Sequence, residues 1–392
     1  MLSRKIENKI AQYLKAFPVV AIIGPRQVGK TTAAKSIQNA LSEKAIYLDL
    51  ESPEDVQKLI DAENYFKERE NRLIIIDEIQ RNIALFPILR SVIDRNRKNG
   101  RFILLGSSSP ELLLNSSETL AGRIAYLEMH PLLFSEVKSN FSFKDLWIKG
   151  GFPNIFLQED AAMSFEMRIQ FIQTYLEREL PIIGLSASPI VLRNLLKMIA
   201  HTQGQLVNYT DYSNALGVEV NTIKRYLDYF EHSFIIRRLQ PYYTNSKKRL
   251  VKSPKIFIRD TGILHALFNI QHSEDLDGFV GKGYSWESFV IQQIIASLKS
   301  NVSAHFYRTQ DGTELDLILV RGMIPVAGIE IKLSNAPKLT RGTSIARNDL
   351  GGIPIYIVTH SVSEDYNYNE GVRITSFERV FNYLERMDLV EK

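Results

Sequence analysis

The sequence predicts an α/β fold at the N-terminus, a helical middle region that contains a winged helix, and a small α/β domain at the C-terminus. Short apolar runs alternate with helical patterns over the first part of the 392 residues, which is typical of a parallel sheet covered by helices on both faces. Helical patterns dominate from about residue 160, and new strand patterns begin near residue 280. We therefore expect domains at 1–160, 161–260 and 261–392.

Composition narrows the class of protein. The chain is 45% hydrophobic and 23% charged and contains no cysteine, as expected of a soluble globular protein without disulfides or thiolate metal sites. No apolar run is long enough for a membrane span, and the N-terminal residues do not resemble a signal peptide. We therefore expect a cytoplasmic protein with no membrane partner. Its net charge of +4 does not by itself indicate a nucleic-acid partner.

The first predicted strand, at 19–23, leads into a segment that fits the phosphate-loop pattern G-x-x-x-x-G-K-T. This segment reads Gly24-Pro25-Arg26-Gln27-Val28-Gly29-Lys30-Thr31-Thr32 and is followed by a helical pattern. The glycines let backbone N–H groups point at phosphates, and the helix N-terminus adds its dipole. Lys30 would contact the β- and γ-phosphates, and the Thr31 hydroxyl would bind Mg²⁺. The segment therefore predicts a nucleoside triphosphate site, and we expect ATP.

Further strands are predicted at 45–50, 73–76, 102–105 and 124–129, and two of them end in polar residues. Asp77 and Glu78 follow the run at 73–76, where Asp77 would hold Mg²⁺ and Glu78 would polarise the attacking water. The run at 102–105 ends in Gly106-Ser107-Ser108, whose hydroxyls would bond the γ-phosphate or the water. An ordinary serine-rich turn is the alternative for this last segment.

The order of these motifs resembles the AAA+ superfamily, and more narrowly a prokaryotic AAA+-like ATPase family with a C-terminal domain of unknown function. The resemblance covers nearly the whole chain. It is carried by the phosphate loop, Tyr47-Leu48-Asp49-Leu50-Glu51, Asp77-Glu78-Ile79-Gln80, Gly106-Ser107-Ser108, Leu120-Ala121-Gly122-Arg123 and Gly150-Gly151-Phe152-Pro153.

The resemblance implies roles for two residues. Ser107 would be the sensor residue, and Arg123 would contact the γ-phosphate, either in its own chain or across a subunit interface in a homo-oligomer. A surface ion pair is the alternative for Arg123. Arg26, inside the loop, would contact phosphate or brace the loop.

A helix–turn–helix pattern between 209 and 230 suggests a winged helix that binds double-stranded DNA. The polar face of its second helix carries Asn221, Thr222, Lys224 and Arg225. The segment 237–259 then holds basic residues and no acidic one, namely Arg237, Arg238, Lys247, Lys248, Arg249, Lys252, Lys255 and Arg259. These side chains would neutralise DNA phosphates. A module that contacts protein only, with a solvated basic hairpin, is the alternative.

The C-terminal region contains acids that strand alternation places on common faces. Glu287 lies on a predicted helix, Asp316 on a strand at 314–320, and Glu330 with Lys332 on the next strand. This arrangement resembles the PD-(D/E)XK nuclease fold, in which such acids hold a divalent metal, here Mg²⁺ or Mn²⁺. Lys332 would orient water or stabilise the developing charge. A degenerate fold kept as a docking platform, with its acids in ion pairs, is the alternative.

The sequence thus predicts an ATPase whose nucleotide state controls a DNA-binding C-terminal half that also cleaves DNA if the acidic site is active. The rival prediction is a slow ATP-dependent switch with an inactive nuclease-like domain that docks protein or DNA.

Overall fold

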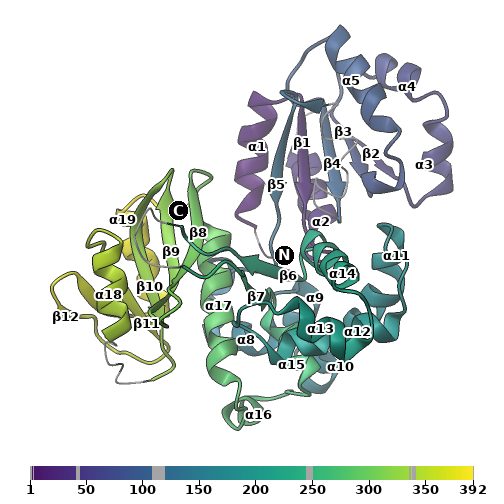
Figure 1. The fold of residues 1–392 in the computed structure, drawn as a ribbon. Helices are drawn as coiled ribbons and strands as arrows, with labels where there is room; N and C mark the ends of the chain where they lie inside the picture. Colours follow the sequence, from purple (N-terminus) through teal and green to yellow (C-terminus); the bar gives the residue numbers. More distant parts are fainter. Residues whose placement is uncertain are drawn as a thin grey trace. The chain divides into compact units, whose positions relative to one another are not determined.

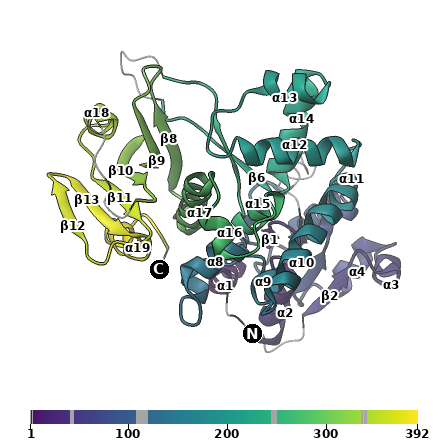
Figure 2. The same cartoon turned by 90° about the horizontal axis from the view of Figure 1, so that it is seen from below.

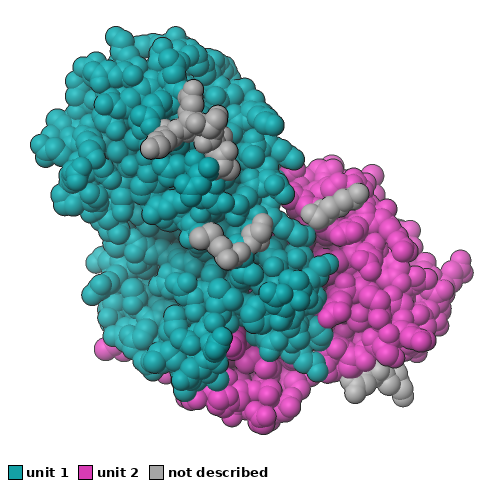
Figure 3. All heavy atoms as spheres, turned by 180° about the vertical axis from the view of Figure 1, so that it is seen from behind, with its two compact units in different colours: residues 1–146, 150–189, 225–235 teal, residues 147–149, 190–224, 236–392 magenta. Residues whose placement is uncertain are grey.

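The computed structural model describes residues 2, 4–40, 45–107, 120–243, 250–334, 337 and 341–391. The chain forms two compact units, and neither is continuous in sequence. One unit comprises residues 1–146, 150–189 and 225–235, and the other comprises 147–149, 190–224 and 236–392 (Figure 3). The three-domain division expected from the sequence remains a prediction.

The first unit is built on a five-stranded parallel sheet. Its strands are β1 (Val19–Ile23), β2 (Ile46–Asp49), β3 (Ile74–Asp77), β4 (Phe102–Gly106) and β5 (Ile124–Glu128). Their order across the sheet is β2-β3-β4-β1-β5 (Figure 1), so β4 lies between the strand that precedes the phosphate loop and the strand that ends in Asp77. All five predicted strands are confirmed.

Apolar helical stripes cover this sheet. Phe66 of α4 and Phe86, Leu89 and Ile93 of α5 are buried in one core with the residues of β3 and β4. The helices before residue 100 are α1 (Ile6–Ala16), α2 (Lys30–Ala40), α3 (Pro53–Lys58), α4 (Ala62–Glu68) and α5 (Leu85–Arg95), and a 3₁₀ turn spans Ile79–Arg81.

The middle of the chain is helical. It contains α7 (Phe134–Val137), α8 (Phe143–Lys149), α9 (Pro153–Phe156), α10 (Ala161–Thr174), a π-helical segment (Tyr175–Glu179), α11 (Leu180–Ile182) and α12 (Pro189–His201). The predicted helix–turn–helix follows as α13 (Tyr209–Leu216) and α14 (Val220–His232). Asn208 caps α13, and Gly217 ends it in the left-handed region at φ 64°. Residues 220–224 of α14 belong to the second unit, and the remainder of the helix belongs to the first.

The second unit contains a two-stranded sheet and a larger mixed sheet. β6 (Ile236–Leu239) and β7 (Lys255–Ile258) pair antiparallel, and α15 (Thr261–Leu267), α16 (Ser273–Asp277) and α17 (Lys282–Ser297) follow. The larger sheet has the order β12-β13-β11-β10-β9-β8. Its strands are β8 (Val302–Arg308), β9 (Glu314–Arg321), β10 (Ile324–Ile331), β11 (Ile355–Thr359), β12 (Tyr366–Asn369) and β13 (Val372–Ser376).

Helices lie on both faces of the mixed sheet. α18 (Arg341–Asp349) lies on one side and α19 (Phe377–Arg386) on the other (Figure 2). Trp286 and Phe289 of α17 contact Phe377 of α19, so α17 packs on the α19 side. β10 runs antiparallel to β9 and parallel to β11. Among all the residues that the structure describes, no helix is both long and apolar enough to cross a membrane.

The first glycine of the phosphate loop offers a test of this packing. A Cβ on Gly24 would lie 2.3 Å from the carbonyl oxygen of Met129, just beyond β5, and its φ is +150°. We expect Gly24→Ala to lower the free energy of unfolding by at least about 2 kcal/mol, because backbone must move to admit the methyl group. Thermal and urea unfolding followed by circular dichroism measure the change.

Gly283→Ala is the matched control. Gly283 lies in α17 with nothing within 4 Å of an added Cβ. Alanine there should raise stability by less than about 1 kcal/mol. Equal stability of Gly24→Ala and the wild type would contradict the packing described.

Candidate functional site

The phosphate loop connects β1 to α2 and contains three residues with positive φ. Gln27 and Gly29 have φ of 63° and 96°, and Gly24 has φ of 150°. A non-glycine residue in the left-handed region costs free energy and is common where a loop binds a ligand. Successive residues of opposite handedness form anion-binding concavities, so the backbone of this loop suits phosphate.

Lys30 begins α2, and its amine turns back into the loop. The buried Nζ donates to the carbonyl oxygens of Gly24 and Pro25, both at 2.9 Å. Burial lowers the pKa of Lys30 to about 8, although the carboxylates of Glu78 and Asp77 oppose this shift. The Lys30 amine is therefore buried and hydrogen-bonded only to neutral carbonyl groups among these contacts. Such an amine is suited to exchange these hydrogen bonds for stronger ones to phosphate oxygens when a nucleotide binds.

Thr31 and Asp77 meet as predicted. The Thr31 hydroxyl donates to Asp77 Oδ2 at 2.7 Å, and the other carboxylate oxygen accepts from the Glu78 N–H at 2.9 Å. Tyr47 of β2 also donates to Asp77 Oδ2, at 2.5 Å. A hydroxyl and a carboxylate side by side are the hard oxygen ligands that Mg²⁺ prefers. The sequence analysis gave Tyr47 no role of its own, because this contact depends on β2 lying next to β3.

Glu78 and Ser107 are joined by a third side chain. The Gln80 amide donates to Glu78 Oε2 and to Ser107 Oγ, the latter at 2.9 Å. Glu78 itself lies in the left-handed region at φ 54°, directly after β3. The structure therefore brings the predicted acid and the predicted sensor serine together through Gln80. Ser108 lies outside the described residues.

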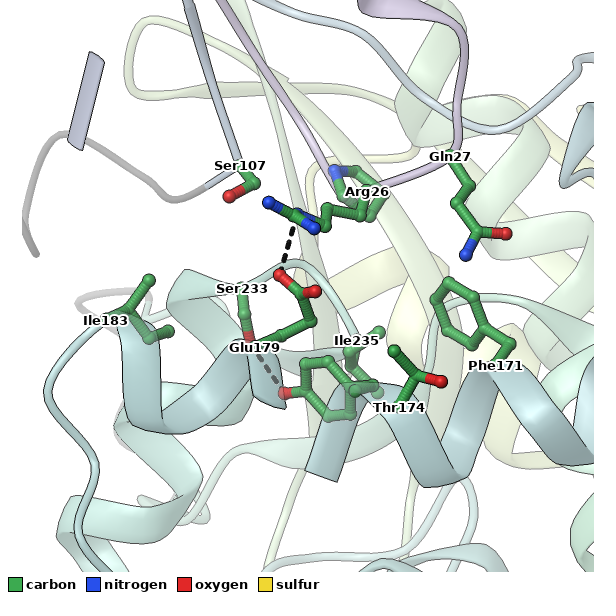
Figure 4. Close-up of a pocket in the computed structure, with 11 residues that line it drawn as sticks. Arg26, Gln27, Ser107, Phe171, Thr174, Glu179, Ile183, Ser233 and Ile235 are labelled. Carbon is green, nitrogen blue, oxygen red and sulfur yellow. Dashed lines mark hydrogen bonds and ion pairs between the residues drawn. The ribbon is translucent and has the colours of Figure 1, made fainter. Parts of the chain in front are cut away.

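Arg26 lies among three glutamates. It forms ion pairs with Glu51 at 2.8 Å, with Glu78 at 3.4 Å and with Glu179 at 2.7 Å, and Figure 4 shows its guanidinium turned toward Glu179. Burial raises the pKa of Glu179, while the charge of Arg26 opposes that rise. Glu179 belongs to the π-helical segment, far from the loop in sequence. No motif could have identified it.

A cavity of about 110 Å³ lies beside this arginine. Arg26, Gln27 and Ser107 line it from the phosphate loop and β4, and the opposite wall comes from α10 and the segments after it (Figure 4). The opposite wall is formed by Phe171, Thr174, Tyr175, Glu179, Ile183, Ser233 and Ile235.

Arg4, near the N-terminus, forms hydrogen bonds that hold the phosphate loop in place. Arg4 is buried and donates to the carbonyl oxygens of Val28 and His130, both at 2.7 Å, and it pairs with Glu136 at 3.0 Å. These contacts tie the loop to the segment after β5. A single arginine near the start of a chain gives no sequence signal for such a role.

Arg123 does not reach the phosphate loop. It precedes β5, whose first residue pairs with Val19 at the start of β1, whereas the loop follows the other end of β1. Its guanidinium pairs instead with Asp94, at 2.6 and 2.9 Å. A γ-phosphate contact within the same chain is therefore wrong, and the ion-pair alternative describes the side chain.

The predicted DNA-binding residues differ in exposure. Asn221, Lys224 and Arg225 of α14 are exposed and Thr222 is half-buried. Lys247, Lys248 and Arg249 lie outside the described residues. Lys255 and Arg259, counted with the basic hairpin, are both buried. The surface charge of this hairpin is therefore lower than its composition predicts.

The C-terminal acids do converge, around a lysine. Lys255 Nζ of β7 donates to Glu287 at 3.1 Å, pairs with Glu314 at 2.6 Å and lies 4.0 Å from Asp316. Asp316 Oδ2 accepts from the backbone N–H of Ile331 at 2.8 Å. Glu330 pairs with Lys332 at 2.5 Å.

This arrangement does not fit the divalent metal expected for Glu287, Asp316 and Glu330. The Lys255 ammonium already lies among these acids, and one oxygen of each is engaged: Glu287 Oε1 by Lys255, Asp316 Oδ2 by a backbone N–H group and Glu330 Oε1 by Lys332. In the described part of the chain, no group of three or more His, Cys, Asp and Glu residues could hold a metal ion. Lys255, which the sequence analysis counted with the basic hairpin, is buried among these acids, and no local sequence pattern indicates this position.

Family models divide the chain into three parts. An AAA domain matches residues 16–138, a domain of unknown function (DUF8612) matches 140–274, and another domain of unknown function (DUF4143) matches 282–380. The AAA match contains the phosphate loop, Asp77, Glu78 and Ser107.

Two curated proteins are similar along most of the chain. "Uncharacterized protein Rv2008c" of Mycobacterium tuberculosis and "Uncharacterized protein Mb2031c" of Mycobacterium bovis are each 37% identical over 347 residues, covering 88% of this chain and 77% of theirs. Among solved structures, the Walker-type ATPase PABY2304 of Pyrococcus abyssi is 16% identical, with a TM-score of 0.46, over 68% of this chain and 96% of its own. The chain belongs to the family of the two mycobacterial proteins, and its N-terminal part is an AAA domain.

Proposed function

We propose that this protein binds and hydrolyses ATP, and that its nucleotide state controls a DNA-binding C-terminal half. The observation that carries the ATPase part is the contact between Thr31 and Asp77 beside the buried Lys30 amine. A phosphate loop, a hydroxyl and a carboxylate meet there in the arrangement that a nucleotide–magnesium complex requires. A cytoplasmic location accords with this function.

The residues divide the work of hydrolysis. Thr31 and Asp77 would hold Mg²⁺, which supplies charge stabilisation at the phosphates. Lys30 and the loop N–H groups bind the phosphates, and Glu78 orients and polarises the attacking water. Gln80 links Glu78 to Ser107, which provides a route by which the sensor serine influences the acid. Arg123 contributes to hydrolysis only if it contacts the nucleotide bound by a second copy of the chain in a homo-oligomer.

Arg26 supports a coupling between nucleotide and helices. In the arrangement described, Glu51, Glu78 and Glu179 share its charge. A γ-phosphate placed at the loop competes for the same guanidinium, because Arg26 itself belongs to the loop. Nucleotide binding then weakens the hold on Glu179 and on the segment Tyr175–Glu179. A ligand biases two arrangements only through such differential contacts.

For the C-terminal half, we favour DNA docking over DNA cleavage. The exposed polar face of α14, with Asn221, Lys224 and Arg225, supports DNA contact. The Lys255 ammonium among the acids disfavours metal-dependent cleavage and Mn²⁺ as a cofactor. Docking of a partner protein on the same half is the competing function, favoured by the burial of Lys255 and Arg259.

Glu78→Gln tests the hydrolysis step. We expect kcat for ATP to fall by about 100-fold or more, because the amide no longer polarises water, while ATP binding is retained. Phosphate release and fluorescent-nucleotide binding measure the two quantities. Lys30→Ala should instead abolish binding. The exposed Glu68→Gln is the control, and a wild-type rate in Glu78→Gln would exclude the assignment.

Glu179→Gln tests the coupling. Removing the negative charge of Glu179 breaks its ion pair with Arg26 and removes the repulsion between this carboxylate and the phosphates of ATP. We therefore expect ATP to bind about two- to fivefold more tightly. Glu177→Gln, an exposed neighbour in the same segment, should leave affinity unchanged. Titration calorimetry in the Glu78→Gln background avoids turnover. Weaker binding by Glu179→Gln would show that the pair prepares the loop for nucleotide, contrary to the proposal.

Fluorescence anisotropy with a labelled duplex tests DNA docking. Lys224→Ala with Arg225→Ala should weaken binding about tenfold and reduce the salt slope of log K by about two, one for each lost phosphate contact. Lys197→Ala, an exposed lysine of α12, is the control. ATP and ADP should give different affinities in the Glu78→Gln background. Absence of salt-sensitive binding in every nucleotide state would favour the protein-docking function.

A further inference from the structure

Lys255 is a buried cation surrounded by acids of the second unit. Its side chain is only 3% exposed, and its ammonium lies 3.1 Å from Glu287, 2.6 Å from Glu314 and 4.0 Å from Asp316. Because the three carboxylates come from α17 and β9 while the lysine comes from β7, one ammonium holds three separate elements together. An ammonium in this position supplies the positive charge that such acids otherwise obtain from a metal ion.

A second buried acid lies next to this group. Ile329 of β10 pairs with Leu317 of β9, so Glu330 and Asp316 are the next residues along these paired strands. The Glu330 side chain is 7% exposed, and its Oε2 is buried without a hydrogen-bond partner. Its other oxygen pairs with Lys332 at 2.5 Å, so this acid receives its counter-charge from a second lysine.

We propose that Lys255 is the resident cation of this acidic cluster, defined as Glu287, Glu314, Asp316 and Glu330, and that the cluster binds no divalent metal ion while Lys255 is in place. Lys255 replaces the ion electrostatically, since it neutralises the carboxylates that would coordinate one. The proposal does not depend on ATP binding at the phosphate loop.

Packing around Lys255 keeps its ammonium in the cluster. Nζ lies 5.6 Å from the centre of the Phe306 ring, and β7 is fixed on both sides of the lysine by backbone hydrogen bonds. A Cβ on Gly204 would lie only 3.4 Å from Glu287 Oε2, so the neighbouring chain closes this side of the acid. Moving the lysine out would remove the ammonium beside Glu287 and Asp316, whose side chains are 12% and 15% exposed, and loss of a counter-charge from such poorly hydrated carboxylates is unfavourable.

The cluster is shared by two of the matched family regions. Lys255 lies in the region 140–274, whereas the four acids lie in the region 282–380. The acids therefore depend on a cation from outside their own region. Because a lysine of one region stabilises acids of the other, the two regions are expected to fold together. Residues 236–392 accordingly belong to one compact unit.

Mn²⁺ binding by the full-length chain tests the proposal. Manganese is detected by electron paramagnetic resonance, without nucleotide and in an Asp77→Asn background that removes the phosphate-loop ligand. We expect no difference in bound Mn²⁺ between this protein and one that also carries Asp316→Asn. Lys255→Met should then bind Mn²⁺ at least about tenfold more tightly and gain thermal stability on its addition.

Lys255→Arg is the matched control, because arginine keeps a positive charge and should not gain Mn²⁺ binding. Binding with Lys255 present that Asp316→Asn abolishes would overturn the proposal, and so would a folded Lys255→Met protein that takes up no Mn²⁺. If Lys255→Met does not fold, the additional change Glu314→Gln lowers the excess negative charge, and the comparison with and without Asp316→Asn still decides the question.

Discussion

The adjacency of β1, β4 and β3 is the constraint on which the nucleotide site depends. Because β4 lies between the other two, the phosphate loop, Ser107 and Asp77 all follow the carboxyl ends of neighbouring strands. Asp77 then accepts hydrogen bonds from Thr31 of α2 and Tyr47 of β2. One carboxylate thus links three elements. The loop conformation, braced by Arg4, belongs to the same preorganisation, which lowers the entropy that binding must overcome.

Each of the two units contains a basic side chain surrounded by several acids, but the two arrangements suit different roles. Arg26 lies among three glutamates at the edge of a cavity, and Lys255 is buried among acids. A half-exposed guanidinium with several partners can change partners at modest free-energy cost. A buried ammonium cannot, because each lost contact leaves a desolvated charge. The first arrangement suits a response to ligand, and the second suits permanent neutralisation.

Sequence reasoning succeeded where a role depends on local pattern and failed where it depends on distant packing. The five parallel strands, the phosphate loop and the Asp77–Glu78 pair follow from apolar runs and fixed spacing, and the structure contains them. Strands β12 and β13 and helix α18 were missed, since their residues are mostly polar or interrupted by glycine. Glu179 and Lys255 acquire their roles from elements remote in sequence. Arg123 was assigned by resemblance, and the register of β5 with β1 places it near the amino ends of the strands, whereas the phosphate loop follows the carboxyl end of β1.

The interleaving of the two units constrains how the chain folds during synthesis. Trp147 belongs to the second unit, where its indole donates to Ser285 at 2.9 Å and its ring contacts Trp286. These partners leave the ribosome more than a hundred residues later, and residues 225–235 complete the first unit only after part of the second has emerged. Neither unit can therefore finish before the other has begun. During synthesis, Trp147 therefore lacks its native partners until Ser285 and Trp286 have been added to the chain.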